Sequence, residues 1–172
     1  MTFKEAVTAA MQMLAEDPRV VFIGQNVCYD GHVVFETLKG IPDDRKIELP
    51  VAEGMQMGMA TGMALSGLVP VCIFPRIDFM LLAMDQLVNH LDKLSEMSCG
   101  QYNPKVIIRT MIGNTSPLHP GPQHSQDHTD ALMAMLKYTA VSRIYALEGV
   151  VSAYREALEC AKSTVVIEGA YR

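Results

Sequence analysis

Two stretches of the chain carry side chains whose types and spacing could do chemistry. The first begins at Glu53, an acid that stands directly before three glycines spaced four residues apart, at positions 54, 58 and 62. Glycine inside a helix costs about 1 kcal/mol relative to alanine, so this spacing predicts either a helix that another backbone approaches closely or simple packing on its own sheet. Glu53 could exchange a proton with a ligand, or it could be a first-turn acid that only stabilises the helix dipole.

The second stretch is a segment rich in glycine, proline and histidine, residues 119–128. A single histidine in such a loop, His124, could work as a general acid or base, because an imidazole titrates near neutral pH. His119, His124 and His128, together with Asp127, could instead ligate a metal ion, as in a metal-dependent hydrolase. The remaining interpretation is a solvated loop whose histidines have no chemical role.

The rest of the sequence alternates short apolar runs with segments of helical periodicity. Thr2 and Glu5 match a capping box before a helix, and the β-branched run at 20–23, closed by Gly24, is typical of a strand buried on both faces. The pattern predicts strands over 20–23, 46–49, 70–74, 105–109, 140–144 and 164–167, and helices over 3–15, 53–66, 78–97, 130–136 and 148–160. Residues 111–128 are predicted to form a long irregular loop, a feature that is usually functional in a compact domain.

This alternation predicts an α/β fold in three layers, with helices on both faces of a parallel sheet. In open sheets of this kind, ligands bind beyond the carboxyl ends of the strands. Four expected loops fall at that edge, namely residues 24–31, 50–53, 74–79 and 111–128. The candidate ligand site is therefore expected there.

Composition restricts the class of protein. A chain of 172 residues is long enough for one well-buried domain, and its formal net charge of −5 leaves no basic face for nucleic acid or an anionic membrane. No apolar run approaches the roughly 20 residues that span a bilayer. The first residues lack a signal-peptide core and the four cysteines form no C-x-x-C pair, so a cytoplasmic protein with reduced thiols is expected. Thirteen methionines and no tryptophan indicate that some apolar surface faces another chain.

The motifs taken together resemble a known family. They are Pro50-Val51-Ala52-Glu53-Gly54, the glycine-containing segment 60–70, Asp78-Phe79, Asp85-Gln86 and Gln123-His124-Ser125-Gln126. In this order and at nearly this spacing, they resemble the pyrimidine-binding domain of the transketolase-like thiamine diphosphate enzymes. The resemblance covers almost the whole chain and is strongest to the β subunit of the decarboxylase component of 2-oxo acid dehydrogenases. It implies the thiamine diphosphate-binding fold of the pyrimidine type.

The resemblance implies specific roles for five residues. In that family a glutamate hydrogen-bonds the ring nitrogen of the cofactor's pyrimidine, an aromatic side chain stacks on the ring, and a loop histidine faces the reacting carbon. Carried over by motif, these are Glu53, Phe79 and His124, with Gln25 and Asp78 as further cofactor-binding residues. A carboxylic acid that shares its proton with the ring nitrogen favours the imino tautomer of the aminopyrimidine, which can then remove the thiazolium proton. No metal ligand is expected on this chain.

The same resemblance implies cofactors and a partner. Thiamine diphosphate and Mg²⁺ are the expected cofactors, with the diphosphate and the metal held by a second chain, because no Gly-Asp-Gly signature with its downstream asparagine is present. Residues 1–172 are expected to form a single pyrimidine-binding domain, without a diphosphate-binding or C-terminal transketolase domain. We expect it to assemble with a separate diphosphate-binding subunit as an α2β2 heterotetramer.

The expected activity is that of a decarboxylase or a transketolase-like lyase or transferase, which cleaves or forms a C–C bond next to a carbonyl of a small molecule, with a 2-oxo acid as donor. Two departures from the relatives bear on the substrate: Gln25 stands where they have an acid, and Pro75-Arg76 differs from their sequence before Phe79. Two alternatives remain open. One is a non-catalytic regulatory partner subunit, against which Glu53 argues, and the other is a metal-dependent hydrolase that uses the His119/His124/His128 loop.

Overall fold

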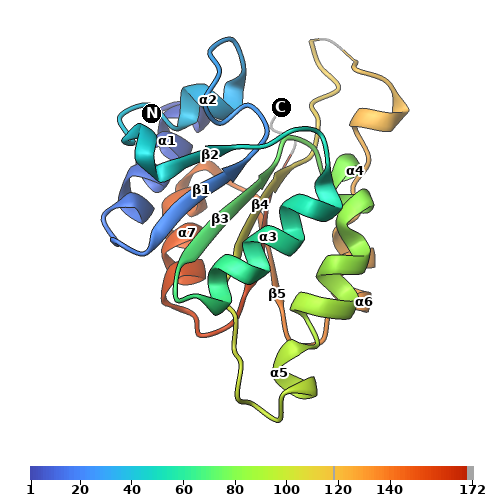
Figure 1. The fold of residues 1–172 in the computed structure, drawn as a ribbon. Helices are drawn as coiled ribbons and strands as arrows, with labels where there is room; N and C mark the ends of the chain where they lie inside the picture. The colour runs from blue at the N-terminus through green and yellow to red at the C-terminus, as the bar shows by residue number, and fades with distance from the viewer. Residues whose placement is uncertain (118, 170–172) are drawn as a thin grey trace.

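A six-stranded parallel sheet forms the centre of the molecule in the computed structural model, which describes residues 1–117 and 119–169 (Figure 1). Its strands are β1 (Val20–Gly24), β2 (Lys46–Glu48), β3 (Val69–Phe74), β4 (Ile107–Met111), β5 (Ala140–Ile144) and β6 (Thr164–Glu168). They lie in the order β2-β1-β3-β4-β6-β5, and every pairing is parallel. The carboxyl ends of all six strands therefore meet at one edge. The predicted fold class is confirmed.

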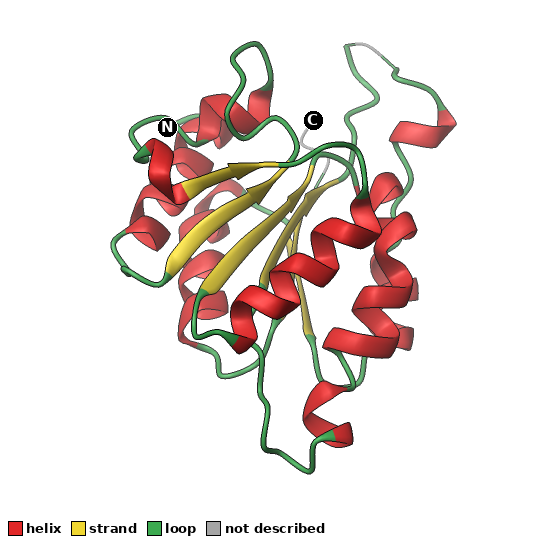
Figure 2. Cartoon of the chain, in the orientation of Figure 1, coloured by secondary structure: helices red, strands yellow, loops and turns green. Residues whose placement is uncertain are grey.

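Helices cover both faces of the sheet (Figure 2). They are α1 (Phe3–Ala15), α2 (Val33–Thr37), α3 (Glu53–Leu65), α4 (Ile77–Met80), α5 (Leu94–Met97), α6 (Thr129–Met135) and α7 (Val150–Glu159). One core lies between the sheet and α1, α2 and α7, and a second core lies between the sheet and α3, α6 and the segment 77–91. Successive strand residues serve the two cores in turn, as Phe22 and Ile23 do, because side chains alternate across a strand.

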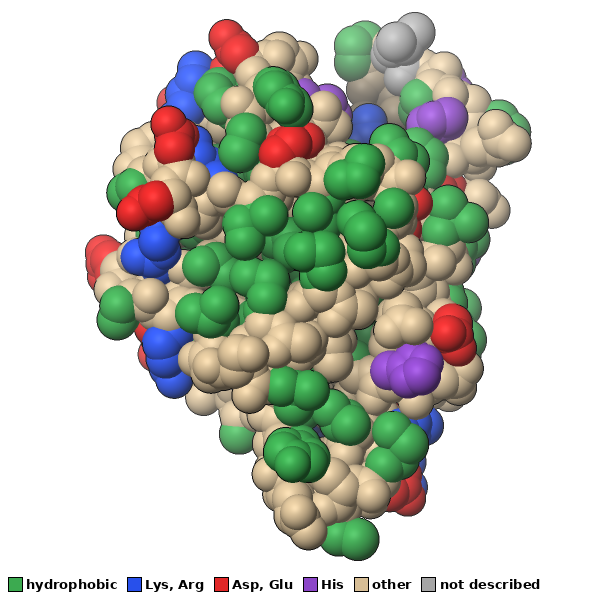
Figure 3. Space-filling view, in the orientation of Figure 1, with side chains coloured by type: hydrophobic (Ala, Val, Ile, Leu, Met, Phe, Trp, Pro, Cys, Tyr) green, Lys and Arg blue, Asp and Glu red, His purple; other side chains and the backbone are tan. Residues whose placement is uncertain are grey.

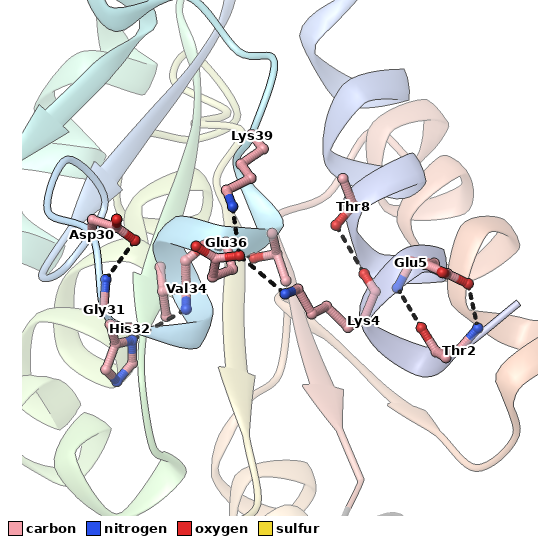
Figure 4. A network of polar contacts seen from close by, with 11 residues as sticks. Thr2, Lys4, Glu5, Thr8, Asp30, Gly31, His32, Val34, Glu36 and Lys39 are labelled. Carbon is pink, nitrogen blue, oxygen red and sulfur yellow. Dashed lines mark hydrogen bonds and ion pairs between the residues drawn. The ribbon is translucent and has the colours of Figure 1, made fainter.

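The helix boundaries follow from local chemistry that the sequence already displays. Thr2 accepts a hydrogen bond from the backbone N–H of Glu5, and the Glu5 carboxylate accepts one from the backbone of Thr2, so the predicted capping box is confirmed (Figure 4). Helix α3 stops before Gly67, whose φ of +92° is readily adopted only by glycine. No helix in residues 1–117 and 119–169 is long and apolar enough to cross a bilayer.

The prediction of one helix over residues 78–97 is wrong. The segment is α4, a 3₁₀ turn over Leu81–Ala83, a π-helical stretch over Asp85–Leu91, and then α5. Asp92 follows the π-helical stretch, and its fully buried carboxylate accepts the backbone N–H groups of Lys137, Tyr138 and Thr139 and pairs with Lys93. That partner segment is more than forty residues away along the chain, so helical periodicity could not reveal the break.

Other differences are smaller. Strand β4 lies two residues later than predicted, and residues 147–149 form a 3₁₀ turn before α7. The short helix α2 was not predicted at all. Its N-terminus is capped by the His32 ring, which accepts a hydrogen bond from the backbone N–H of Val34 (Figure 4). Histidine is not among the residues that usually cap helices, namely Ser, Thr, Asp and Asn, so no capping signal in the sequence marked this helix start.

Candidate functional site

Four neighbouring strands deliver the predicted site residues to one edge of the sheet. Gln25 follows β1, Glu53 follows β2, Phe79 follows β3, and His124 lies in the loop after β4. Strands β2, β1, β3 and β4 are consecutive in the sheet, and the chain reverses its direction of winding around β1. Such a switch point is where open α/β sheets bind ligands. The predicted site residues therefore lie where the site was expected, at the carboxyl ends of the strands.

Glu53 is a buried acid at the first position of α3. Its exposed fraction is 5%, and Gln25 Nε2 donates a hydrogen bond to its Oε1 at 3.3 Å. Among the residues that the structure describes, Gln25 is the one hydrogen-bond partner of this carboxyl group. A buried carboxyl group with a single neutral partner retains bonding capacity for a ligand. The pairing of Gln25 with Glu53 also fits the prediction that the two residues belong to one site.

A second acid, Glu48, fixes the loop that carries Gln25. The Glu48 carboxylate at the end of β2 accepts the backbone N–H groups of Asn26, Val27 and Cys28 at 2.7, 2.8 and 2.9 Å. Asn26 has a φ of +60°, and these three bonds hold the backbone in that turn. This role of Glu48 was not predicted from the sequence. The available signal was an acid at the carboxyl end of a strand adjacent to a polar loop.

Phe79 and His124 face each other across the site. Their ring centroids are 5.3 Å apart with an interplanar angle of 87°, an edge-to-face contact, and both side chains are half-buried. Gly113 is required for this arrangement, because a Cβ at that position would stand 1.9 Å from the backbone oxygen of His124. The end of the histidine loop therefore folds back onto its own beginning, and this contact places the imidazole beside Phe79.

Asp78 anchors the same loop from the other side. Its Oδ1 accepts the backbone N–H of Gln126 at 3.3 Å and the Gln126 side-chain amide at 2.9 Å. Its Oδ2 is buried and has no hydrogen-bond partner in residues 1–117 and 119–169. Asp78 thus positions the loop two residues beyond His124 and leaves one acceptor open. The direct contact with a cofactor that was expected of Asp78 stays a prediction.

Within the described residues, the histidines of residues 119–128 do not come together as a metal-ligand set. His119 Nδ1 accepts the backbone N–H of Gly121, whereas His128 Nε2 is buried without a partner in the described part of the chain. Asp127 pairs with Arg143 and accepts the backbone N–H of Thr129. No group of three or more His, Cys, Asp or Glu side chains among the described residues is arranged to hold a metal ion. A Gly- and Pro-rich loop does not bring i and i+4 histidines together as a helix would.

Two of the three glycines of α3 allow a neighbouring segment to approach the helix closely. A Cβ on Gly54 would lie 3.6 Å from the backbone oxygen of Leu82, and one on Gly58 would lie 3.3 Å from the Gln86 side chain. Nothing lies within 4 Å of such an atom on Gly62. The neighbour of the helix is therefore the 81–91 segment, and the third glycine remains open at the surface.

A family model described as the transketolase, pyrimidine binding domain, matches residues 1–169. The chain belongs to this family. Among curated relatives, the mitochondrial pyruvate dehydrogenase E1 component subunit beta of Caenorhabditis elegans is 32% identical over 152 residues, covering 81% of this chain and 42% of the relative. The 3-methyl-2-oxobutanoate dehydrogenase subunit beta of Mycobacterium tuberculosis is 29% identical over 176 residues, covering 98% of this chain and 49% of the relative. This pyrimidine-binding domain thus spans less than half the length of these two relatives.

Solved structures agree on the fold. An inactive beta4 tetramer of a split-gene transketolase superposes with a TM-score of 0.73 at 18% identity, covering 97% of this chain and 50% of that one. Transketolase from Leishmania mexicana gives a TM-score of 0.71 at 18% identity, covering 96% of this chain and 25% of that one. The predicted resemblance to transketolase-like pyrimidine domains and to E1 β subunits is confirmed.

Proposed function

We propose that this chain binds the pyrimidine half of thiamine diphosphate and works with a second chain that holds the diphosphate and Mg²⁺. The observation that carries the proposal is the buried Glu53 at the carboxyl edge of the sheet, within the motif Pro50–Gly54, with Phe79 and His124 at the same edge. Membership of the pyrimidine-binding family supports the choice of cofactor. The names of the relatives support a 2-oxo acid as the donor substrate.

Each site residue has a defined task in this proposal. When bound, thiamine diphosphate supplies a nucleophilic carbon that adds to a carbonyl group. Glu53 holds a proton at the pyrimidine ring nitrogen, and the Gln25 amide orients the Glu53 carboxyl group. Phe79 offers an aromatic ring for stacking, and its edge-to-face contact keeps His124 at the reacting side, where it stabilises developing negative charge or moves a proton.

The surface beside Glu53 suits a protein partner. Figure 3 shows hydrophobic side chains gathered along the exposed side of α3. Met55 and Met59 are 45% and 39% exposed, and Val51 and Leu82, next to the same face, are 78% and 71% exposed. An apolar patch of flexible methionines is typical of a surface that another chain covers. The diphosphate-binding subunit of an α2β2 heterotetramer is the partner that we assign to this face.

Titration calorimetry tests the proposal. The chain is titrated with thiamine diphosphate and Mg²⁺ alone, and again after mixing with a diphosphate-binding-domain chain encoded in a neighbouring open reading frame. We expect binding by the pair and little or none by the lone chain, because the diphosphate dominates the charge of the ligand. Phe79→Ala should weaken binding by the pair about tenfold, whereas Phe35→Ala, a half-buried phenylalanine away from the site, should not. Micromolar binding by the lone chain, or no effect of Phe79→Ala, would contradict the proposal.

A further inference from the structure

A cavity lies at the same edge of the sheet but apart from Glu53, Phe79 and His124, none of which lines it. Its volume is about 360 Å³, within the range of small-molecule sites. It is open to solvent on one side and is bordered by α1, α2, the ends of β4 and β6, and Asn114, Ser116, Pro117 and Pro120 of the loop after β4. Most of its wall is apolar, with Phe3, Val7, Val33, Met111, Ile112 and Pro117 contributing.

Two of the three cations in this wall are already neutralised. Arg109 is fully buried, and it donates from Nε to Glu168 at 2.7 Å and from a terminal nitrogen to Thr37 at 2.8 Å. Tyr154 completes this network through a 2.7 Å hydrogen bond to Glu168. Lys4 pairs with Glu36 at 3.1 Å across the α1–α2 contact (Figure 4). Neither cation therefore needs a ligand to balance its charge.

Arg76 is the exception. Among the described residues, its Nε is buried without a hydrogen-bond partner, and a terminal nitrogen donates to the backbone oxygen of the preceding Pro75 at 2.9 Å. No carboxylate in residues 1–117 and 119–169 forms an ion pair with it. Burial lowers the pKa of His32, and the positive charges of Arg76 and Arg109 lower it further. Among the described residues, Arg76 thus gives the cavity one positive charge that no carboxylate neutralises.

We propose that this cavity binds a small organic monoanion, a carboxylic acid with an apolar body, and that Arg76 is its counter-ion. A guanidinium group pairs with a carboxylate through two parallel hydrogen bonds, and Arg76 lines the cavity without an ion-pair partner among the described residues. One free cation balances a single negative charge, which favours a carboxylate over a phosphate dianion. The apolar wall accommodates the hydrocarbon body of the acid. This site is independent of the proposed function, since none of the residues assigned to thiamine diphosphate lines it.

Methionine-methyl NMR of the full chain, without thiamine diphosphate, tests this proposal. Met111 lines the cavity, so its ¹³C-labelled methyl group, assigned with Met111→Leu, reports on occupancy. The probes are 3-methylbutanoate, the neutral 3-methylbutanamide and inorganic phosphate. We expect saturable shifts of the Met111 signal with the carboxylate and weaker binding of the other two. No shift, equal binding of the amide, or a preference for phosphate would overturn the proposal.

Variants then assign the charge to Arg76. Arg76→Gln should weaken carboxylate binding about tenfold or more, because a charge-assisted hydrogen bond is lost, while Arg76→Lys should retain part of it. Arg155→Gln removes the same charge from an exposed position on α7 that does not line the cavity, and it should leave binding unchanged. An unchanged spectrum of the other methionines shows that each variant is folded. Equal affinity in wild type and folded Arg76→Gln would overturn the role of Arg76.

Discussion

At the scale of single residues, the candidate site depends on side chains that have few internal partners. Glu53 is buried yet accepts one hydrogen bond from a neutral amide, and Asp78 leaves a buried oxygen without a partner among the described residues. Buried polar groups are normally satisfied, so unsatisfied ones at one edge of a sheet are a reason to expect a ligand there. The two acids differ in their tasks, since Asp78 already holds the loop through Gln126.

Replacing Glu53 by glutamine tests the proton-transfer role. An amide has the same shape but cannot exchange a proton with the pyrimidine nitrogen, so turnover by the assembled enzyme should fall at least about a hundredfold. The thermal midpoint of the chain should change little. Steady-state rates with saturating cofactor measure the effect, and Glu159→Gln, an exposed acid at the end of α7, is the matched control. Retention of more than about a tenth of the activity would refute the assignment.

His124 can be assigned to a step by separating cofactor activation from substrate chemistry. If the imidazole acts on the substrate-derived group, His124→Ala should slow turnover while exchange of the thiazolium proton for deuterium, followed by NMR, stays nearly unchanged. His128→Ala is the control, because its imidazole has no contact with Phe79 among the described contacts. A parallel loss of exchange and turnover in His124→Ala would place the residue in cofactor activation instead.

At the scale of elements, carboxylates that bind backbone N–H groups decide how segments join. Glu48 fixes the loop after β1, and Asp92 ties the end of the π-helical stretch to residues 137–139. Burial would raise the pKa of Asp92, but the Lys93 ion pair and the three N–H groups outweigh burial and hold this pKa at about 2. In both cases a carboxylate distant in sequence, and not a local capping or turn residue, binds the backbone N–H groups of the segment.

Stability should therefore depend on pH through Asp92. Its folded pKa lies below the value near 3.9 of an unfolded aspartate, so its contribution is complete above about pH 4 and is lost as the pH falls towards 2. Asp92→Asn should lower the free energy of unfolding by roughly 2 kcal/mol at neutral pH, with a smaller difference at pH 2. Urea titrations at several pH values measure this, with Asp130→Asn, an exposed aspartate, as control. If wild type and Asp92→Asn differ in free energy of unfolding by the same amount at pH 7 and pH 2, the stabilisation does not come from the charge of Asp92.

At the scale of the whole molecule, two surface features are suited to binding partners: one to another protein and one to a small molecule. The exposed methionines of α3 stand beside Glu53, whereas the Arg76 cavity lies between α1, α2 and the ends of β4 and β6. The first is a convex apolar surface suited to a protein, and the second is a concave site suited to a small molecule. The loop after β4 belongs to both regions, since Asn114, Ser116, Pro117 and Pro120 line the cavity and His124 contacts Phe79.

Assembly should be sensitive to charge on the α3 face. Met59→Glu places a carboxylate in the patch, and burying it against the diphosphate-binding subunit would be costly, so the affinity of the two chains should fall by at least about tenfold. The lone chain should remain folded because Met59 is 39% exposed. Analytical ultracentrifugation of the mixed chains measures this. Met97→Glu on α5, where the methionine is 60% exposed, should leave assembly intact; equal effects of both variants would argue against a partner on α3.

Local pattern in the sequence determined most of the elements and the position of the candidate acid. The run at 20–23, the capping box at Thr2 and the strand-to-helix junction before Glu53 are encoded by neighbouring residues, and the structure reproduces all three. The order of motifs from residue 50 to residue 126 was sufficient to indicate the family, because motif spacing along one chain needs no tertiary information.

Only the tertiary structure decided the contacts between distant segments. The strand order, the break at Asp92, the fold-back of His124 onto Gly113 and the Glu48 bonds to residues 26–28 all join residues that are separated in the sequence. The lack of an ion-pair partner for Arg76 among the described residues likewise depends on which segments pack around it. Periodicity and capping signals report the preference of a residue for its immediate neighbours. The packing of the sheet against its two helix layers decides which backbone groups each carboxylate binds. The same packing decides which cation has no carboxylate partner.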